Sequence, residues 1–183
     1  LAQARVLQGR WEEAETAAGR ATQLAPNLPQ PWFVLGLVDA EAGRLVDAES
    51  HFTRAMDLGG ISLPGLINRA LVRERRADYQ GARDDLEAAR AIDPSAPVAI
   101  LRLRVLSTGL VSRSELAREV CATVNELAVR AVPPADLTLV LLAAARAGAP
   151  SCVEDWLEGL DRDDLESAQV AAAYRAGVNR SRR

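Results

Sequence analysis

The sequence contains no lysine, a single histidine and only two cysteines, so its 22 basic residues are all arginine. Aromatic side chains make up only 4% of its 183 residues. The absence of lysine is associated with proteins from high-GC bacterial genomes. A Ser–His–Asp, Cys–His or multi-histidine metal site would have to include the one histidine, His51. These shortages argue against most catalytic and metal centres.

The charge balance and the lack of long apolar runs exclude further classes. The net charge is −3 and the pI is about 5.3, so no overall positive field favours nucleic acid or an anionic membrane surface. The apolar segment 137–145 is much shorter than the roughly 20 residues that a membrane-spanning helix needs. We expect neither nucleic-acid binding nor a membrane span. Since the chain starts with Leu1 rather than methionine, we also expect its native N-terminus to be missing.

The surroundings of His51 do not resemble a catalytic site. Asp47 lies four residues before it and faces it on a helix, whereas the adjacent Ser50 points elsewhere. No GxGxxG, Walker or HExxH motif occurs. We therefore expect a surface histidine, no enzymatic activity, no cofactor and no metal. The acidic pair Asp84 and Asp85 is expected on a solvated helix face.

The two cysteines, Cys121 and Cys152, fall in separate predicted helices. Neither belongs to a CxxC pair or lies near the histidine, which excludes a typical zinc site. Isolated cysteines of this kind are usually packing residues, so we favour that interpretation. A disulfide between them is the alternative.

An internal repeat is the strongest positive feature. Three stretches align at a fixed offset of 34 residues. The aligned columns share small or apolar residue types: Ala14, Ala48 and Ala82; Ala21, Ala55 and Ala89; Leu24, Leu58 and Ile92; Gly9, Gly43 and Ala77; Trp11, Leu45 and Tyr79.

The aligned residues match a known 34-residue motif. In the second stretch Trp32-x-x-Leu35-Gly36 is followed by Ala48-x-x-x-Phe52. This spacing resembles the tetratricopeptide repeat, a helix–turn–helix unit. The departures from the family pattern are Asp39, where an aromatic residue is usual, and Gly60, where proline is usual. The third stretch keeps Asn68-Arg69-Ala70, Asp78-Tyr79, Ala82-x-x-x-Leu86 and Asp93-Pro94.

The resemblance implies an all-α solenoid of stacked antiparallel hairpins wound into a right-handed superhelix. Residues 1–94 are expected to form the clear repeats, the first one truncated, and residues 95–183 degenerate helical hairpins that continue the same solenoid. The sequence predicts helices over residues 1–8, 11–24, 30–42, 45–58, 63–76, 79–92, 96–107, 112–131, 135–147, 151–160 and 164–176.

In that family the first helices of successive repeats line a concave groove. Transferring its positions gives a mostly apolar groove here, with Asn68 and Arg102 as directional polar groups. Two explanations are open for this surface: a partner segment binds there, or the C-terminal helices of the chain cover it. The predicted groove residues are Phe33, Leu37, Ile67, Asn68, Leu71, Arg75, Leu101, Arg102 and Val105.

The resemblance implies a non-catalytic scaffold that binds a protein or peptide segment in this groove. The alternative is a regulatory or docking portion of a larger enzyme or of a secretion or envelope assembly. Self-association through the apolar helix residues Leu137–Leu142 is a third interpretation. We expect a cytoplasmic protein, with the periplasm as the alternative because the native N-terminus is expected to be missing.

Overall fold

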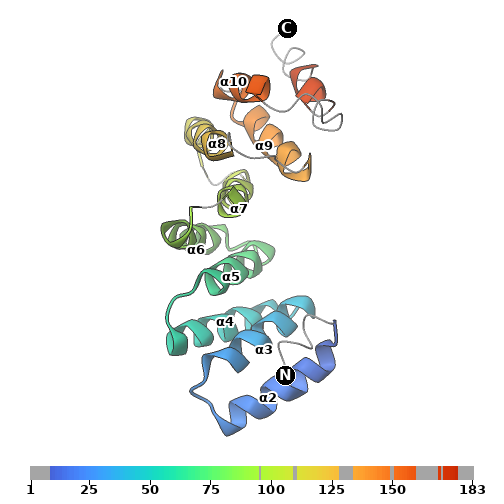
Figure 1. Ribbon diagram of the computed structural model, residues 1–183, viewed down its shortest axis with the longest axis vertical. Helices are drawn as coiled ribbons and strands as arrows, with labels where there is room; N and C mark the ends of the chain where they lie inside the picture. The colour runs from blue at the N-terminus through green and yellow to red at the C-terminus, as the bar shows by residue number, and fades with distance from the viewer. Residues whose placement is uncertain are drawn as a thin grey trace. The chain divides into compact units, whose positions relative to one another are not determined.

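The computed structural model describes residues 9–94, 96–108, 111–127, 134–148, 151–159, 169 and 171–176. These residues form helices joined by turns and short loops, with no strand among them, so the all-α prediction is confirmed (Figure 1). The chain divides into two compact units, Leu1–Asp93 and Pro94–Arg183. That the second unit continues the same solenoid stays a prediction.

Unit 1, residues 1–93, contains five described helices, each packed against the next along the chain. Their ends differ from the predicted ones by at most one residue, whereas the helix predicted over residues 1–8 lies outside the described residues. Helices α3 and α4 form one hairpin, and α5 and α6 form the next. The five are α2 (Trp11–Leu24), α3 (Pro29–Glu41), α4 (Leu45–Gly59), α5 (Leu63–Arg75) and α6 (Tyr79–Ile92).

Small residues sit where the helices of unit 1 cross. Ala14, Ala48 and Ala82, the first repeat column, are all fully buried. Gly36 of α3 faces the ring of Phe52 of α4 so closely that a Cβ atom on it would lie 2.7 Å from two ring carbons. A larger residue at these positions would push the helices apart. Small residues recur in the repeat columns because neighbouring helices pack closely at these positions.

The turns that precede α2, α4 and α6 explain the Gly9, Gly43 and Ala77 column. All three residues adopt left-handed backbone, with φ of 69°, 76° and 62°. Glycine adopts this conformation freely, whereas the Cβ of Ala77 costs about 1 kcal/mol there. The third turn keeps its shape partly because the Asp78 carboxylate accepts a 3.0 Å hydrogen bond from the Gly81 amide at the start of α6.

Unit 2, residues 94–183, is built around one large apolar cluster. Helix α8 (Arg113–Leu127) begins with a side-chain cap, because Ser112 Oγ accepts a 3.2 Å hydrogen bond from the Glu115 amide. The described helices are α7 (Ala96–Leu106), α8 (Arg113–Leu127), α9 (Pro134–Arg146), α10 (Ser151–Gly159) and the helical residues 171–176. The cluster includes Leu103, Leu106, Val120, Val124, Leu137, Val140, Val153 and Trp156.

The interpretation of the two cysteines as separate packing residues is wrong. Cys121 of α8 and Cys152 of α10 form a disulfide, with their Cα atoms 5.7 Å apart. They are 31 residues apart in the sequence and meet because α10 packs directly against α8. The disulfide links two helices of unit 2 and closes a loop that contains α9.

We predict that Gly36→Ala lowers the free energy of unfolding by about 1–3 kcal/mol, because the new methyl group overlaps the Phe52 ring. Gly19→Ala is the matched control. Gly19 also lies within a helix, α2, but within the described part of the chain no atom of a neighbouring element lies within 4 Å of the place its methyl group would take. Its replacement should therefore stabilise by about 0.5–1 kcal/mol. Urea unfolding followed by circular dichroism measures both. Equal effects of the two changes would contradict the close α3–α4 contact.

We predict that removing the disulfide, by Cys121→Ser with Cys152→Ser, destabilises unit 2 by about 2–4 kcal/mol, because the open loop gains entropy in the unfolded chain. Hydrogen exchange read by mass spectrometry should show faster exchange in α8 and α10. Helices α3 and α4 serve as the internal control, since unit 1 contains no cysteine. Two thiols that react in the oxidised, denatured protein would show that the disulfide does not form.

Candidate protein-interaction site

Four of the predicted groove residues share one surface of unit 1, which we call the α3/α5 face. Phe33 and Leu37 lie on α3, Ile67 and Leu71 lie on α5, and all four side chains are half-buried. Helix α3 contacts α5 as well as α4, so the two pairs lie on neighbouring helices. The Phe33 ring packs 5.4 Å from the Phe52 ring of the core, which fixes its position. The α3/α5 face thus packs against the core of unit 1 through Phe33 and is partly exposed to solvent.

Polar groups accompany this apolar face. Asn68 Nδ2 donates a 2.8 Å hydrogen bond to the Pro64 carbonyl one turn earlier in α5. Arg75, exposed at the end of α5, donates from Nη1 to the Ala40 carbonyl at 2.6 Å. Ala40 lies in the last turn of α3, where carbonyl groups lack partners within the helix and attract cations. Arg75 therefore ties the ends of α3 and α5 together, whereas its predicted place in a groove stays a prediction.

The predicted groove residues of unit 2 are placed differently. Leu101 is half-buried, but Val105 and Arg102 are buried. Arg102 Nη2 donates to Glu119 Oε1 at 3.0 Å, and its Nη1 pairs with the second oxygen of the same carboxylate. The expectation that a partner can contact the Arg102 and Val105 side chains is therefore wrong. Helix α7 packs against both α8 and α9, and this packing buries the two side chains. A single groove from α3 to α7 stays a prediction.

The helix expected to mediate self-association is largely internal. Leu137, Val140 and Leu141 belong to the core of unit 2, and Leu139 is half-buried. Of the large apolar residues in this segment, only Leu142 is strongly exposed, at 64%. Self-association through α9 would therefore depend on one large apolar side chain.

Comparison with known proteins finds similarity in structure alone. No protein-family model and no curated protein matches the sequence. MamA from Desulfovibrio magneticus RS-1 aligns with a TM-score of 0.71 and 18% identity over 90% of this chain and 93% of its own. YrrB, described as a TPR protein with an unusual peptide-binding site, aligns with a TM-score of 0.69 and 12% identity over 93% and 88%. TTC0263, a thermophilic TPR protein of Thermus thermophilus, aligns with a TM-score of 0.55 and 18% identity over 94% and 95%.

The chain has the tetratricopeptide-repeat fold. Two of the matched structures are described as TPR proteins, and the helix pairs, small-residue crossings and left-handed turns of unit 1 agree with the 34-residue repeat that its sequence contains. Among the described residues, no helix of this fold is both long and apolar enough to cross a membrane.

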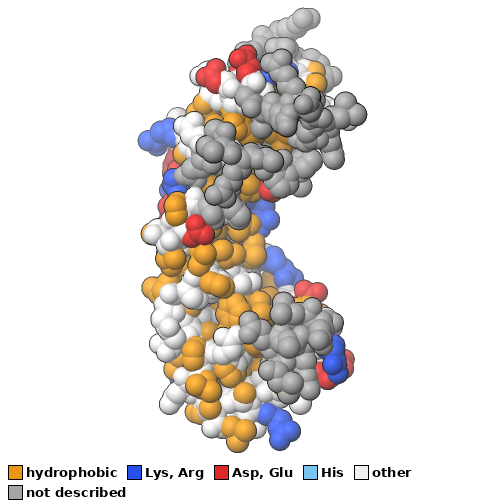
Figure 2. Space-filling view, viewed as in Figure 1, with side chains coloured by type: hydrophobic (Ala, Val, Ile, Leu, Met, Phe, Trp, Pro, Cys, Tyr) orange, Lys and Arg blue, Asp and Glu red, His pale blue; other side chains and the backbone are white. Residues whose placement is uncertain are grey.

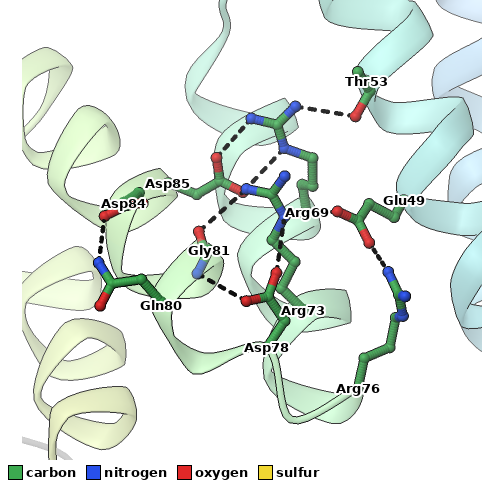
Figure 3. A network of polar contacts seen from close by, with 10 residues as sticks. All are labelled: Glu49, Thr53, Arg69, Arg73, Arg76, Asp78, Gln80, Gly81, Asp84 and Asp85. Carbon is green, nitrogen blue, oxygen red and sulfur yellow. Dashed lines mark hydrogen bonds and ion pairs between the residues drawn. The ribbon is translucent and has the colours of Figure 1, made fainter. Parts of the chain in front are cut away.

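A buried ion-pair network braces the repeats of unit 1 against each other (Figure 3). The Asp85 carboxylate of α6 is buried and binds Arg69 of α5 through two hydrogen bonds, at 3.0 and 2.6 Å. It also accepts a 2.9 Å bond from Arg73. Arg69 reaches on to the Thr53 hydroxyl of α4 at 3.0 Å. Placing Asp85 on a solvated face was therefore wrong, whereas its neighbour Asp84 is exposed as expected.

The same network uses the arginines that end α5. Glu49 of α4 accepts a 2.8 Å hydrogen bond from Arg73 Nε, and its other oxygen pairs with Arg76. The positive charges at this helix end are thus matched to an acidic side chain of the preceding helix (Figure 3). This cluster therefore has a structural role, since it joins the end of α5 to α4.

His51 occupies the corresponding place in the preceding repeat. Its Nδ1 lies 2.6 Å from Oδ2 of Asp39, which is buried, rather than bonding to Asp47. Arg44 Nε donates to the other Asp39 oxygen at 2.6 Å, and this hydrogen bond raises the pKa of Arg44. The Trp32 ring lies 5.5 Å from the imidazole. His51 is therefore a half-buried part of the α3–α4 contact, which corrects its interpretation as a plain surface residue.

The arrangement around His51 offers no evident chemistry. Across the described residues, no group of three or more histidine, cysteine or acidic side chains could hold a metal ion. The imidazole makes its polar contact with a carboxylate, and no hydroxyl or thiol of the described residues is bonded to it. An Asp–His pair without a nucleophile lacks the arrangement that acyl transfer needs. Its evident effect is to fix α3 against α4.

We predict that Asp85→Ala lowers the free energy of unfolding by about 2–4 kcal/mol, because Arg69 and Arg73 are left mostly buried without their shared carboxylate. Asp84→Ala is the matched control from the adjacent position. Its carboxylate is exposed and accepts a 2.9 Å hydrogen bond from Gln80, so we expect a change within about 0.5 kcal/mol. Urea unfolding of both variants is the measurement, and a neutral Asp85→Ala would contradict the network.

Proposed function

We propose that this protein is a non-catalytic scaffold that binds a protein or peptide segment on the α3/α5 face. The observation that carries the proposal is that apolar side chains of α3 and α5 remain partly exposed, although core positions of the same hairpins are filled. Phe52 of α4 and Leu86 of α6 are fully buried, whereas Phe33, Leu37 and Leu71 on α3 and α5 keep part of their surface in water. Partly exposed apolar side chains gathered on one face favour association, at roughly 25 cal/mol per Å² buried.

The polar groups of the face suggest how a bound segment would be oriented. Arg75 has five N–H donors and spends one of them on the Ala40 carbonyl in its described contact. The Asn68 amide nitrogen is engaged with Pro64, which leaves its carbonyl oxygen as an acceptor. A partner would therefore insert apolar side chains between α3 and α5 and place a carbonyl or carboxylate group near Arg75. The likeness to YrrB, described as having a peptide-binding site, supports this class of ligand.

The second candidate, a docking portion of a larger secretion or envelope assembly, is favoured by one observation. The Cys121–Cys152 disulfide fits an oxidising compartment, because thiols in the cytosol are kept reduced. We propose that the protein works in such a compartment, the periplasm in a bacterial cell, rather than in the cytoplasm. Thiol labelling of the protein in intact cells tests this, and two free thiols would favour the cytoplasm.

We predict that Leu37→Glu and Leu71→Glu each weaken peptide binding at least about tenfold, because a charge replaces an apolar contact on the α3/α5 face. The probes are peptides selected from a random 12-residue display library against the unaltered protein and titrated by fluorescence anisotropy. We expect the two variants to remain folded, since both side chains are half-buried rather than buried.

Leu142→Glu is the matched control, because it introduces the same charge at an exposed leucine of unit 2. It should bind the selected peptides as the unaltered protein does. Peptides that bind the folded Leu37→Glu and Leu71→Glu variants with unchanged affinity would place the site elsewhere. Unfolding of both variants would instead show that the α3/α5 face is core, and would overturn the proposal.

A further inference from the structure

Four large apolar side chains of unit 1 stand in solvent at the turns between hairpins. Leu24 is 85% exposed, Leu28 54%, Ile61 73% and Ile92 52%. Leu24 and Leu28 flank the α2–α3 turn, Ile61 lies in the α4–α5 turn, and Ile92 ends α6. None of them belongs to the α3/α5 face. We call these four residues the turn edge.

The turn edge lies along one side of unit 1. Helices α2, α4 and α6 end on the same side as α3 and α5 begin (Figure 1). A Cβ atom on Gly59, the last residue of α4, would lie 2.8 Å from Pro29, the first residue of α3, so the α2–α3 and α4–α5 turns are neighbours. The α4–α5 turn, which contains Ile61, therefore lies next to the α2–α3 turn, which Leu24 and Leu28 flank. The end of α6, with Ile92, follows on the other side of the α4–α5 turn (Figure 1).

This edge is almost uncharged. The turn segments are Ala-Pro-Asn-Leu (25–28), Gly-Gly-Ile-Ser (59–62) and Ala-Ile-Asp-Pro (91–94), which contain one charged residue, Asp93. By contrast, 26% of the whole chain is charged. Figure 2 shows hydrophobic and uncharged side chains over much of the visible surface of unit 1. An apolar surface without charge meets an identical surface without like-charge repulsion, whereas a charged edge would repel its own copy.

We propose that the turn edge is a self-association surface, and that its partner is a second copy of this chain. Ile61 lies in the middle of the edge, between the leucines of the α2–α3 turn and Ile92. A two-fold axis near Ile61 brings the two Ile61 side chains together. It also places the leucines of one protomer toward Ile92 of its partner. Such an isologous contact buries every member of the edge in both protomers.

The size of the edge sets the strength of the contact. Stable dimers bury about 800 Å² on each partner, which is more than four side chains provide. The dimer is therefore weak and forms only as the protein concentration rises. It leaves the α3/α5 face open, so a partner segment and a second copy bind the same protomer together.

The test measures mass against concentration by sedimentation equilibrium, from about 5 to 500 μM, a range that spans the weak affinities of small interfaces. The unaltered protein should move from its 19.6 kDa monomer toward twice that mass. Ile61→Asp and Ile61→Arg should each stay monomeric, because like charges then meet at the axis. An equimolar mixture of the two should associate again, since opposite charges face each other. An unaltered protein that stays monomeric, or a mixture that fails to associate, would overturn the proposal.

Two exposed apolar residues away from the edge provide controls. Val46→Asp changes the opposite end of α4, and Leu142→Asp changes α9 of unit 2. Both should associate as the unaltered protein does. Loss of association in Leu142→Asp but not in Ile61→Asp would assign self-association to α9 instead. Ile61→Asp should still bind the display-selected peptides, so failure of peptide binding and failure of dimerisation are separate results.

Discussion

The close approach of the two helices within each hairpin is the constraint on which unit 1 depends. Fully buried alanines at 14, 48 and 82 and the contact of Gly36 with the Phe52 ring leave no room for larger side chains. Helices α3 and α5 bury one set of apolar side chains, such as Val34 and Val72, and keep part of Phe33, Leu37 and Leu71 in water. The α3/α5 face is thus a consequence of how the hairpins pack.

Pairs of polar side chains fix the position of one helix against the next once apolar packing has brought the helices together. In the second repeat Asp39 pairs with His51, and in the third Arg73 pairs with Asp85, with a spacing of twelve residues in both. The acidic partner sits on the first helix in one repeat and on the second helix in the other. Buried ion pairs contribute little net stability but are costly to break, so this alternation favours the native pairing of helices over a shifted one.

The two units owe their stability to different features, which bears on function. Unit 1 has regular repeats, a polar network and two apolar surfaces, the α3/α5 face and the turn edge. Unit 2 has a single large apolar cluster and a disulfide between α8 and α10. A change in redox conditions therefore acts on unit 2, while partner binding and self-association are proposed for unit 1.

The sequence by itself determined the helices and turns, because each is encoded within a few residues. The alanine columns and the glycines at left-handed turns are local signals that repeat every 34 residues in unit 1, and the caps at Asp78 and Ser112 are local too. Only the tertiary structure decided the pairing of Cys121 with Cys152, the burial of Arg102 and the partner of His51. Each of these contacts depends on which side chain of another helix lies opposite. In unit 2 the sequence does not repeat at a regular 34-residue spacing, so the sequence does not indicate which residues face each other.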